Sequence, residues 1–277
     1  MADAVDDTMA AVDIGNSRIK VGLFAKAEVA ATPPGELPRP NRTFSFLPDA
    51  DGLAGFSTWL APHLPDQIAW WLGSVERTYA SKLLDWLRAA GARKLVLLSS
   101  GDLPLTVSLP RPDMVGIDRL LDAVAINRLR PSGQPGIIVD LGSAITVDLV
   151  SAAGAFVGGA IMPGIGMSAR ALHEFTDLLP LIEMVSLSDP PAALGAGTES
   201  AMRSGLFWGA VGGIRRLVEE LSAACGGRPL VYLTGGAAES VANLIAPGTS
   251  YYPHLTLAAI ALVQAAGSDD SISATRK

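Results

Sequence analysis

The chain has 277 residues, of which 49% are hydrophobic and 17% charged, and its formal net charge is -6. This length and apolar content suffice for one large domain or two closely associated ones. The negative charge argues against nucleic acid and anionic membrane surfaces as partners. A single cysteine, Cys225, excludes an intramolecular disulfide or a cysteine metal cluster and fits a reducing compartment.

The start of the chain differs from a signal peptide. Residues 1–10 contain three Asp and no Lys or Arg, so we interpret them as a loose tail. The longest apolar stretch, 255–266, is shorter than the roughly 18 residues that a membrane helix needs. These features predict a cytoplasmic protein without a membrane partner.

The first predicted element is a hairpin over residues 10–24. An apolar run leads into the turn Asp13-Ile14-Gly15-Asn16-Ser17, and the alternating run 19–23 follows. Residues 136–150 repeat this pattern, with the turn Asp140-Leu141-Gly142-Ser143-Ala144 placed 127 residues after the first. We interpret the repeat as an internal duplication close to half the chain length.

The remaining pattern is that of a three-layer α/β protein. A Pro-rich excursion occupies 32–42, and 130–136 forms a linker between two lobes, 11–131 and 136–266, with a second loose tail at 267–277. Strands are predicted at 68–72, 94–98, 156–162 and 230–233, and helices at 74–90, 117–129, 198–224 and from 238.

The two Asp-Gly turns are candidate phosphate-binding sites. A strand that ends in Asp-x-Gly places a carboxylate beside a glycine whose backbone N–H can approach a phosphate closely. Asp13 would then order Mg²⁺ and its waters, with Asn16, Ser17 and Lys20 reaching phosphate oxygens. Either turn alone is more simply a hairpin closure, and the duplication favours the nucleotide interpretation.

A third glycine element, Thr234-Gly235-Gly236, follows an apolar strand. It would let a backbone lie flat against an adenine ring, although Gly-Gly between a strand and a helix is also a common simple turn.

Taken together, five motifs resemble those of type III pantothenate kinases, over nearly the whole chain from Val12 to Leu262. They are Asp13-Ile14-Gly15-Asn16-Ser17, Gly116-Ile117-Asp118-Arg119, Asp140-Leu141-Gly142-Ser143-Ala144, Gly158-Gly159-Ala160-Ile161-Met162-Pro163-Gly164 and Thr234-Gly235-Gly236. The second and fourth distinguish this family from other actin-like kinases. The resemblance implies two duplicated ribonuclease H-like (actin-like ATPase) lobes with a nucleotide cleft between them.

The resemblance also implies an activity: ATP-dependent phosphorylation of the primary hydroxyl of pantothenate to 4'-phosphopantothenate, the first step of coenzyme A biosynthesis. Implied cofactors are ATP, Mg²⁺ and a monovalent cation, K⁺ or NH4⁺. The implied partner is a second copy of the chain, because relatives are homodimers with the substrate pocket at the subunit interface. The segment 166–179 and the helix from Thr198 are the candidate self-association surface.

Site residues are assigned from the same resemblance. Asp118 is the candidate base, since an alcohol of high pKa needs a carboxylate to accept its proton. Asp140 would bind the monovalent cation, and Asp13 would bind Mg²⁺ through water. ATP is assigned to Asp13, Ile14, Gly15, Asn16, Ser17, Arg18, Ile19, Lys20, Ser143, Gly235 and Gly236, and substrate to Gly116, Ile117, Asp118, Arg119, Thr198 and Leu109.

Several of these assignments have simpler structural alternatives. Arg119 is either a bidentate donor to the pantothenate carboxylate or a charge on a helix face, and Thr198 on its own pattern is a helix N-cap. Leu109 stands where several relatives present a Tyr. His63, His173 and His254 lack metal-ligand spacing and are interpreted as structural.

Three other functions compete with this one. The first is a kinase of the same fold that acts on another small alcohol or carboxylate. The second is a regulator that binds ATP without catalysis, against which the intact set Asp13, Asp118 and Asp140 argues. The third, a chaperone or filament lobe, would need insertions for which 277 residues leave little room.

Overall fold

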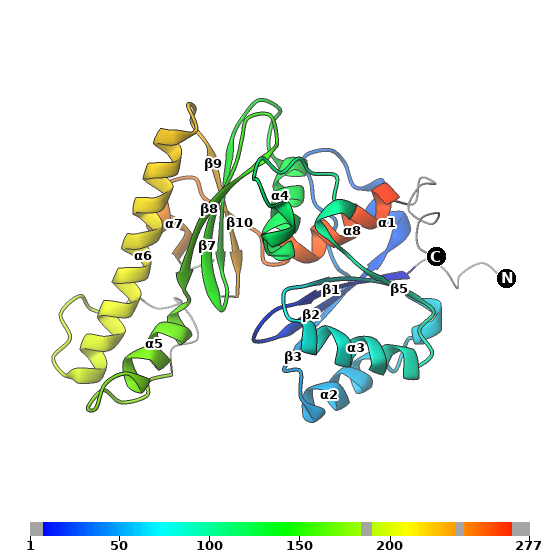
Figure 1. Cartoon of the computed structure of the whole chain (residues 1–277), viewed down its shortest axis with the longest axis horizontal. Coiled ribbons are helices and arrows are strands. Elements are labelled where there is room, and N and C mark those ends of the chain that lie inside the picture. Colours follow the sequence, from blue (N-terminus) through cyan, green and yellow to red (C-terminus); the bar gives the residue numbers. More distant parts are fainter. Residues whose placement is uncertain (1–7, 184–189, 237–240, 268–277) are drawn as a thin grey trace. The chain divides into compact units, whose positions relative to one another are not determined.

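The computed structural model describes residues 8–183, 190–236 and 241–267 (Figure 1). Two compact units are present. Unit 1 contains the described residues up to Leu105, Pro110–Leu129, and the described residues from His254 onward; unit 2 contains Thr106–Leu109 and Arg130–Pro253. The predicted lobes differ from this grouping in two places, because residues 254–266 pack with the first unit and residues 106–109 with the second.

Unit 1 is built on a five-stranded sheet in the order β3-β2-β1-β4-β5, with β1 paired antiparallel to β2 and parallel to β4. The predicted first hairpin is confirmed. Its first strand, however, begins inside the predicted tail, because Met9 and Ala10 pair with Phe24 and Leu23 and are fully buried. The strands are β1 Thr8–Ile14, β2 Ile19–Ala25, β3 Arg42–Phe46, β4 Ala69–Ser74 and β5 Lys94–Leu97.

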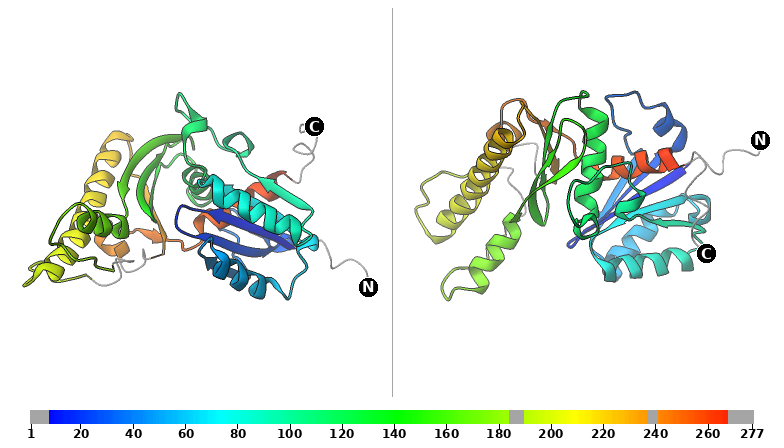
Figure 2. Two further views of the ribbon diagram at one scale, coloured as in Figure 1. Left: turned by 60° about the horizontal axis from the view of Figure 1, so that its bottom comes forward. Right: turned by 45° about the horizontal axis from the view of Figure 1, so that its top comes forward.

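Helices cover both faces of this sheet. Apolar side chains of β1, β2 and β4 form one core with α2 and α3, and α4 and α8 pack on the opposite face, where α8 contacts β1 and β4 (Figure 2). The helices are α1 Lys26–Ala31, α2 Ala50–Leu60, α3 Arg77–Ala89, α4 Ile117–Leu129 and α8 Leu255–Gly267, with short 3-10 turns at Pro65–Gln67, Ser100–Asp102 and Pro112–Met114.

Unit 2 repeats the same strand arrangement. Its sheet has the order β10-β9-β6-β7-β8, so β6 pairs antiparallel with β7 and parallel with β9, as β1 does with β2 and β4. The strands are β6 Gly136–Leu141, β7 Ala144–Val150, β8 Phe156–Pro163, β9 Leu230–Gly235 and β10 Ser250–Tyr251; the helices are α5 Ile165–Glu174, α6 Thr198–Ala224 and α7 Ala242–Ile245. The internal duplication read from the sequence is therefore present in the topology.

The two faces of the unit 2 sheet differ in character. Ile137, Val139 and Leu141 of β6 point into an apolar core shared with α5, α6 and α7. Because side chains alternate along a strand, Asp140 lies on the opposite face. The helix predicted from Ala238 begins outside the described residues, and the described α7 has four residues. In the described ranges, no helix combines the length and apolarity required to cross a membrane.

Candidate active site

The β1–β2 turn of unit 1 places a buried carboxylate beside an amine. Asp13, 9% exposed, lies at the end of β1 directly opposite Lys20 of β2, and its Oδ2 is 3.7 Å from Lys20 Nζ. The turn between them is closed by the Gly15 N–H, which donates to the Arg18 carbonyl at 3.0 Å. Asn16, Ser17 and Arg18 are exposed at its tip, whereas Ile14 and Ile19 are buried beneath it.

A second carboxylate, Asp118, enters the same region from the first turn of α4. Its Oδ1 accepts a hydrogen bond from the Arg119 backbone N–H at 2.8 Å, and the positive end of the helix dipole also favours an anion there. Gly116 allows this geometry, because a β-carbon at that position would lie 2.6 Å from Asp118 Oδ1.

Asp13, Lys20 and Asp118 form one electrostatic group. Burial raises the pKa of Asp13, Lys20 lowers it, and the negative charge of Asp118 raises it again. Burial likewise raises the pKa of Asp118, against the lowering effects of the Arg119 N–H, the Arg119 charge and Lys20. Two carboxylates whose environments disfavour ionisation, with an amine beside one of them, are typical of a site that handles protons and phosphate charge.

His254, interpreted from the sequence as structural, belongs to this neighbourhood. It precedes α8, and its pKa is lowered by burial and by the positive charge of Lys20. Its position next to Lys20 depends on α8 packing in unit 1, more than 230 residues along the chain from that lysine. No local sequence signal marks such a pairing.

The corresponding turn of unit 2 carries hydroxyl groups around its aspartate. Asp140 of β6 pairs with Thr146 of β7 on one side and with Thr234 of β9 on the other, and both threonines are buried. Gly235, which follows Thr234, has a φ of +102° and a β-carbon there would lie 2.5 Å from the Leu141 carbonyl oxygen, so only glycine fits. Gly236 is exposed beyond the strand.

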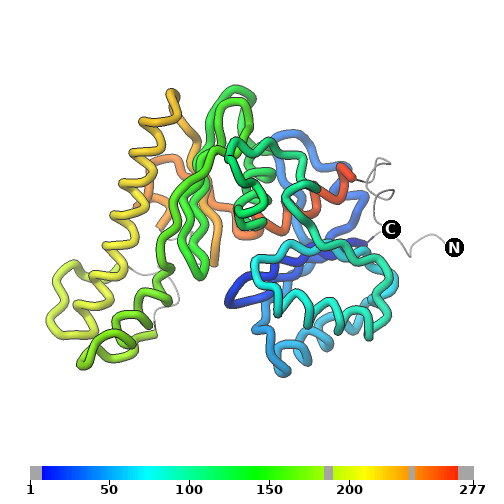
Figure 3. The backbone as a smooth tube through the Cα atoms, in the orientation of Figure 1, coloured from blue at the N-terminus to red at the C-terminus, as the bar shows by residue number. Residues whose placement is uncertain are grey.

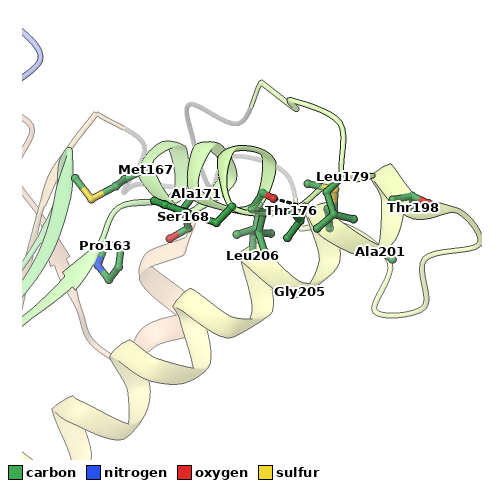
Figure 4. Close-up of a pocket in the computed structure, with 13 residues that line it drawn as sticks. Pro163, Met167, Ser168, Ala171, Thr176, Leu179, Thr198, Ala201, Gly205 and Leu206 are labelled. Carbon is green, nitrogen blue, oxygen red and sulfur yellow. Dashed lines mark hydrogen bonds between the residues drawn. The ribbon is translucent and has the colours of Figure 1, made fainter.

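The turn also connects to a large pocket in unit 2. The Ser143 carbonyl accepts the Gly164 N–H at 3.1 Å, at the point where α5 begins. From there a pocket of about 1050 Å³ extends between α5 and α6, with mainly apolar walls that include Met167, Leu179 and Leu206 (Figure 4). Thr198, the first residue of α6, is exposed and lines the pocket at its other end.

Leu109, the last predicted substrate residue, lies near the start of β8. Its Cδ2 would be 3.6 Å from a β-carbon built on Gly158, and the neighbouring Ser108 N–H donates to the Phe156 carbonyl. Unit 1 thus brings Asp13, Lys20, Gly116, Ile117, Asp118 and Arg119 into one region. Ser143, Asp140, Thr198, Leu109, Gly235 and Gly236 all belong to unit 2.

The chain is similar to known proteins along most of its length. A family model described as type III pantothenate kinase matches residues 9–220. A type III pantothenate kinase of Porphyromonas gingivalis strain W83 is 33% identical, with 89% of this chain and 93% of that protein covered. A protein of the same name from Dehalococcoides mccartyi strain CBDB1 is 31% identical, with 92% and 94% covered.

Solved structures share the fold at much lower identity. The activator of the 2-hydroxyisocaproyl-CoA dehydratase from Clostridium difficile, solved with bound ADPNP, superposes with a TM-score of 0.51 at 13% identity, covering 98% of this chain and 100% of that one. The predicted fold, an actin-like α/β architecture with two mixed sheets, is confirmed by this likeness and by the duplicated strand order.

Proposed function

Since the chain belongs to the type III pantothenate kinase family, we propose that it transfers the γ-phosphoryl group of ATP to the primary hydroxyl of pantothenate. The observation that carries this proposal is the group formed by Asp13, Lys20 and Asp118 in unit 1, which supplies a proton acceptor and phosphate-binding charges together. The product, 4'-phosphopantothenate, enters coenzyme A biosynthesis.

Asp118 is the proposed general base. It is half-buried, and its carboxylate is oriented by the Arg119 N–H at 2.8 Å. A pKa raised by burial makes a carboxylate a stronger proton acceptor. Asp118 would accept the hydroxyl proton as the oxygen–phosphorus bond forms, which contributes about 10²- to 10⁴-fold to the rate in such reactions.

Asp13 and Lys20 are the proposed phosphate and metal contacts. Mg²⁺ is held in phosphoryl-transfer sites by one or two carboxylates, water and phosphate oxygens, and it neutralises charge on the transferred group. Asp13, at the end of a buried strand and beside a glycine turn, fits this donor set through its ordered carboxylate. Lys20 would contact a phosphate oxygen from the opposite strand, and the exposed turn residues would surround the nucleotide.

The acceptor would be bound by the Gly116-Ile117-Asp118-Arg119 segment. The Arg119 guanidinium offers a planar pair of donors that matches the pantothenate carboxylate. Leu109 and Thr198 are the proposed contacts from unit 2. Leu109 presents an apolar side chain and so contributes no hydrogen bond to the substrate.

Asp140 is the proposed site of the monovalent cation. Asp140 pairs in the sheet with Thr146 and Thr234, and carboxylate and hydroxyl oxygens suit K⁺ or NH4⁺. Ser143, Gly235 and Gly236 would contact the nucleotide, since the glycines leave the backbone of β9 open to close approach.

We also propose that the chain is a homodimer whose interface includes α5 and α6. Phe175 and Leu178 are 83% and 89% exposed at the end of α5, and Leu194 before α6 is 88% exposed. Together with the walls of the pocket between the helices they form an apolar surface of the kind that marks protein interfaces. A Phe175→Asp change should give monomers by light scattering after gel filtration, whereas Phe44→Leu in the unit 1 core should leave the oligomer intact.

The proposed function is tested by incubating the purified protein with ATP, Mg²⁺ and pantothenate, with and without K⁺, beside a panel of other small alcohols and carboxylates. Phosphorylation of pantothenate that depends on K⁺ is the expected result. Turnover of another acceptor would contradict the substrate assignment but keep the reaction class. ATP binding without turnover of any acceptor would contradict the enzymatic assignment and favour a regulator.

A further inference from the structure

We propose that a buried hydrogen bond between Asp122 of α4 and Thr256 of α8 is a positioning contact that holds Asp118 against the Asp13–Lys20 pair. Thr256 Oγ1 donates to Asp122 Oδ1 at 2.8 Å. The two residues are 134 positions apart in the sequence and lie in the same unit. The inference rests on the proposed function through the role of Asp118.

The contact is expensive to bury and is not needed to fill space. Asp122 is 2% exposed and Thr256 is 9% exposed. Their helix neighbours, among them Leu120, Leu121 and Leu257, are apolar and buried, so the two helices already have an apolar interface. Burying a carboxylate there costs free energy, and a polar contact inside an apolar interface usually fixes one relative placement of its helices.

The placement of α4 on α8 bears directly on the site. Asp122 follows Asp118 by one helical turn, so the two carboxylates lie on the same side of α4. The other helix of the pair, α8, packs on β1 and β4. A shift of α4 along or around α8 therefore moves Asp118 relative to the end of β1, where Asp13 lies.

Gly73 shows how closely these elements converge. It is the β4 residue that pairs with Asp13, and a β-carbon built on it would lie 2.8 Å from Leu121 Cδ1 of α4 and 3.7 Å from Ile260 Cδ1 of α8. Both helices thus rest on the strand position next to Asp13. The Asp122–Thr256 hydrogen bond joins α4 to α8. Figure 3 shows the path of the chain through these elements.

The test compares variants that keep or remove the bond. Thr256→Val keeps the shape of the side chain and removes the hydroxyl donor. Thr256→Ser keeps the donor, and Asp122→Asn keeps an oxygen acceptor. We expect Thr256→Val to lower kcat about tenfold with little change in the KM for ATP, since small misplacements of a catalytic group cost rate. We also expect the acid limb of the kcat/KM profile of Thr256→Val to move to lower pH. A displaced Asp118 gains contact with water, and its pKa then falls toward the ordinary value.

Val263→Ala is the matched control, because it removes buried methyl groups from the same helix and should lower the melting temperature without touching the bond. This control should keep the kcat and the pH profile of the wild type. Thr256→Ser and Asp122→Asn should keep the wild-type kcat within about threefold. The proposal is overturned if folded Thr256→Val matches the wild type, if Val263→Ala loses as much kcat, or if Asp122→Asn loses as much as Thr256→Val. Where Thr256→Val does not fold, Thr256→Ala takes its place on the same readouts.

A substrate-independent measurement separates this proposal from the proposed function. If the wild type does not phosphorylate pantothenate, the function fails, and the Asp118 carboxyl is titrated directly by ¹³C NMR, with Asp118→Asn to assign the signal. A lower pKa of Asp118 in Thr256→Val than in Val263→Ala supports the positioning contact, and equal pKa values in the two variants overturn it.

Discussion

The β1–β2 hairpin of unit 1 and the β6–β7 hairpin of unit 2 share a topology but carry different polar groups. In unit 1, Asp13 is paired with an amine and lies within electrostatic reach of a second carboxylate, Asp118. In unit 2, Asp140 pairs in the sheet with Thr146 and Thr234, two residues that carry hydroxyl groups. The first set can move protons and bind phosphate charge, whereas the second offers neutral oxygen donors around one carboxylate.

The difference shows how a duplicated fold can divide its chemistry. Each hairpin turns at a glycine, Gly15 or Gly142, and the residues that follow in each half determine what the turn can bind. Unit 1 gains Asp118 because α4 begins beside the end of β4, where a β-carbon on Gly116 would contact Val75 at 3.5 Å. We therefore expect substitutions in the two hairpins to have different effects on the reaction.

The largest effect is expected at Asp118. Asp118→Asn should lower kcat by about two or more orders of magnitude and leave ATP binding intact, because the amide cannot accept a proton. Turnover and nucleotide affinity are measured together, by a coupled assay and by calorimetry. Asp113→Asn is the control, since Asp113 is exposed in the preceding turn and paired with Arg111. Near-normal turnover in Asp118→Asn would remove this carboxylate from the mechanism.

A smaller effect, of a different kind, is expected in unit 2. Asp140→Asn should raise the K⁺ concentration needed for half-maximal activity about tenfold or more, because the cation loses a charged ligand. Activity is titrated against K⁺ at constant ionic strength. Asp118→Asn, assayed at the same K⁺ concentrations, should keep the wild-type midpoint on its residual activity. Equal K⁺ midpoints in Asp140→Asn and the wild type would contradict the division between the hairpins.

The charge beside Asp118 should set the pH dependence of the reaction. The acid limb of kcat/KM is expected above the ordinary aspartate range, because burial raises the Asp118 pKa. Arg119→Gln removes a cation that lowers this pKa, so the limb should move to still higher pH, and the KM for pantothenate should rise severalfold as a carboxylate ligand is lost. Arg111→Gln provides a control for loss of a nearby exposed cation. A limb that moves to lower pH in Arg119→Gln would contradict the assignment.

The smallest effect concerns the stability of unit 1. The pKa of Asp13 is raised in the folded state. Protonated Asp13 therefore stabilises the folded protein at low pH, and this contribution to the free energy of unfolding is lost as the pH rises through the raised pKa. Asp13→Asn should therefore raise the free energy of unfolding at pH 7 by on the order of 1 kcal/mol. The gain should shrink as pH falls toward the ordinary value of 3.8. Urea unfolding at pH 7 and pH 4 measures it, and a gain that grows on acidification would contradict the sign.

The sequence predicted the parts of the fold that depend on local patterns. The hairpins around Gly15 and Gly142 and the helices 117–129 and 198–224 all lie where predicted, because turn glycines and apolar periodicity are local signals. Comparison of the two turns suggested Asp13 and Lys20 as phosphate-site candidates, whereas Asp118 was assigned from the family resemblance, because no local pattern links residue 118 to the end of β1.

Features that depend on distant contacts were not predictable in this way. α8 is buried on nearly all sides, so its composition indicates burial but not which sheet it covers. The segment that forms α8 was assigned to the second lobe. Because of this assignment, the interaction of His254 with Lys20 and that of Asp122 with Thr256 were both missed. β3 and α2 were also missed, because β3 has only five residues and α2 contains two glycines, which form helices poorly.

The placement of α8 also affects how the chain can be assembled as it is made. A ribosome releases β1, β4 and α4 long before α8, and residues 130–253 of unit 2 are synthesised between α4 and α8. Until α8 emerges, the apolar face of β1 and β4 and the buried carboxylate of Asp122 lack the helix that covers them. Unit 2, apart from the short segment Thr106–Leu109, is continuous along the chain, so it can complete its core first, and the N-terminal unit becomes the last to close.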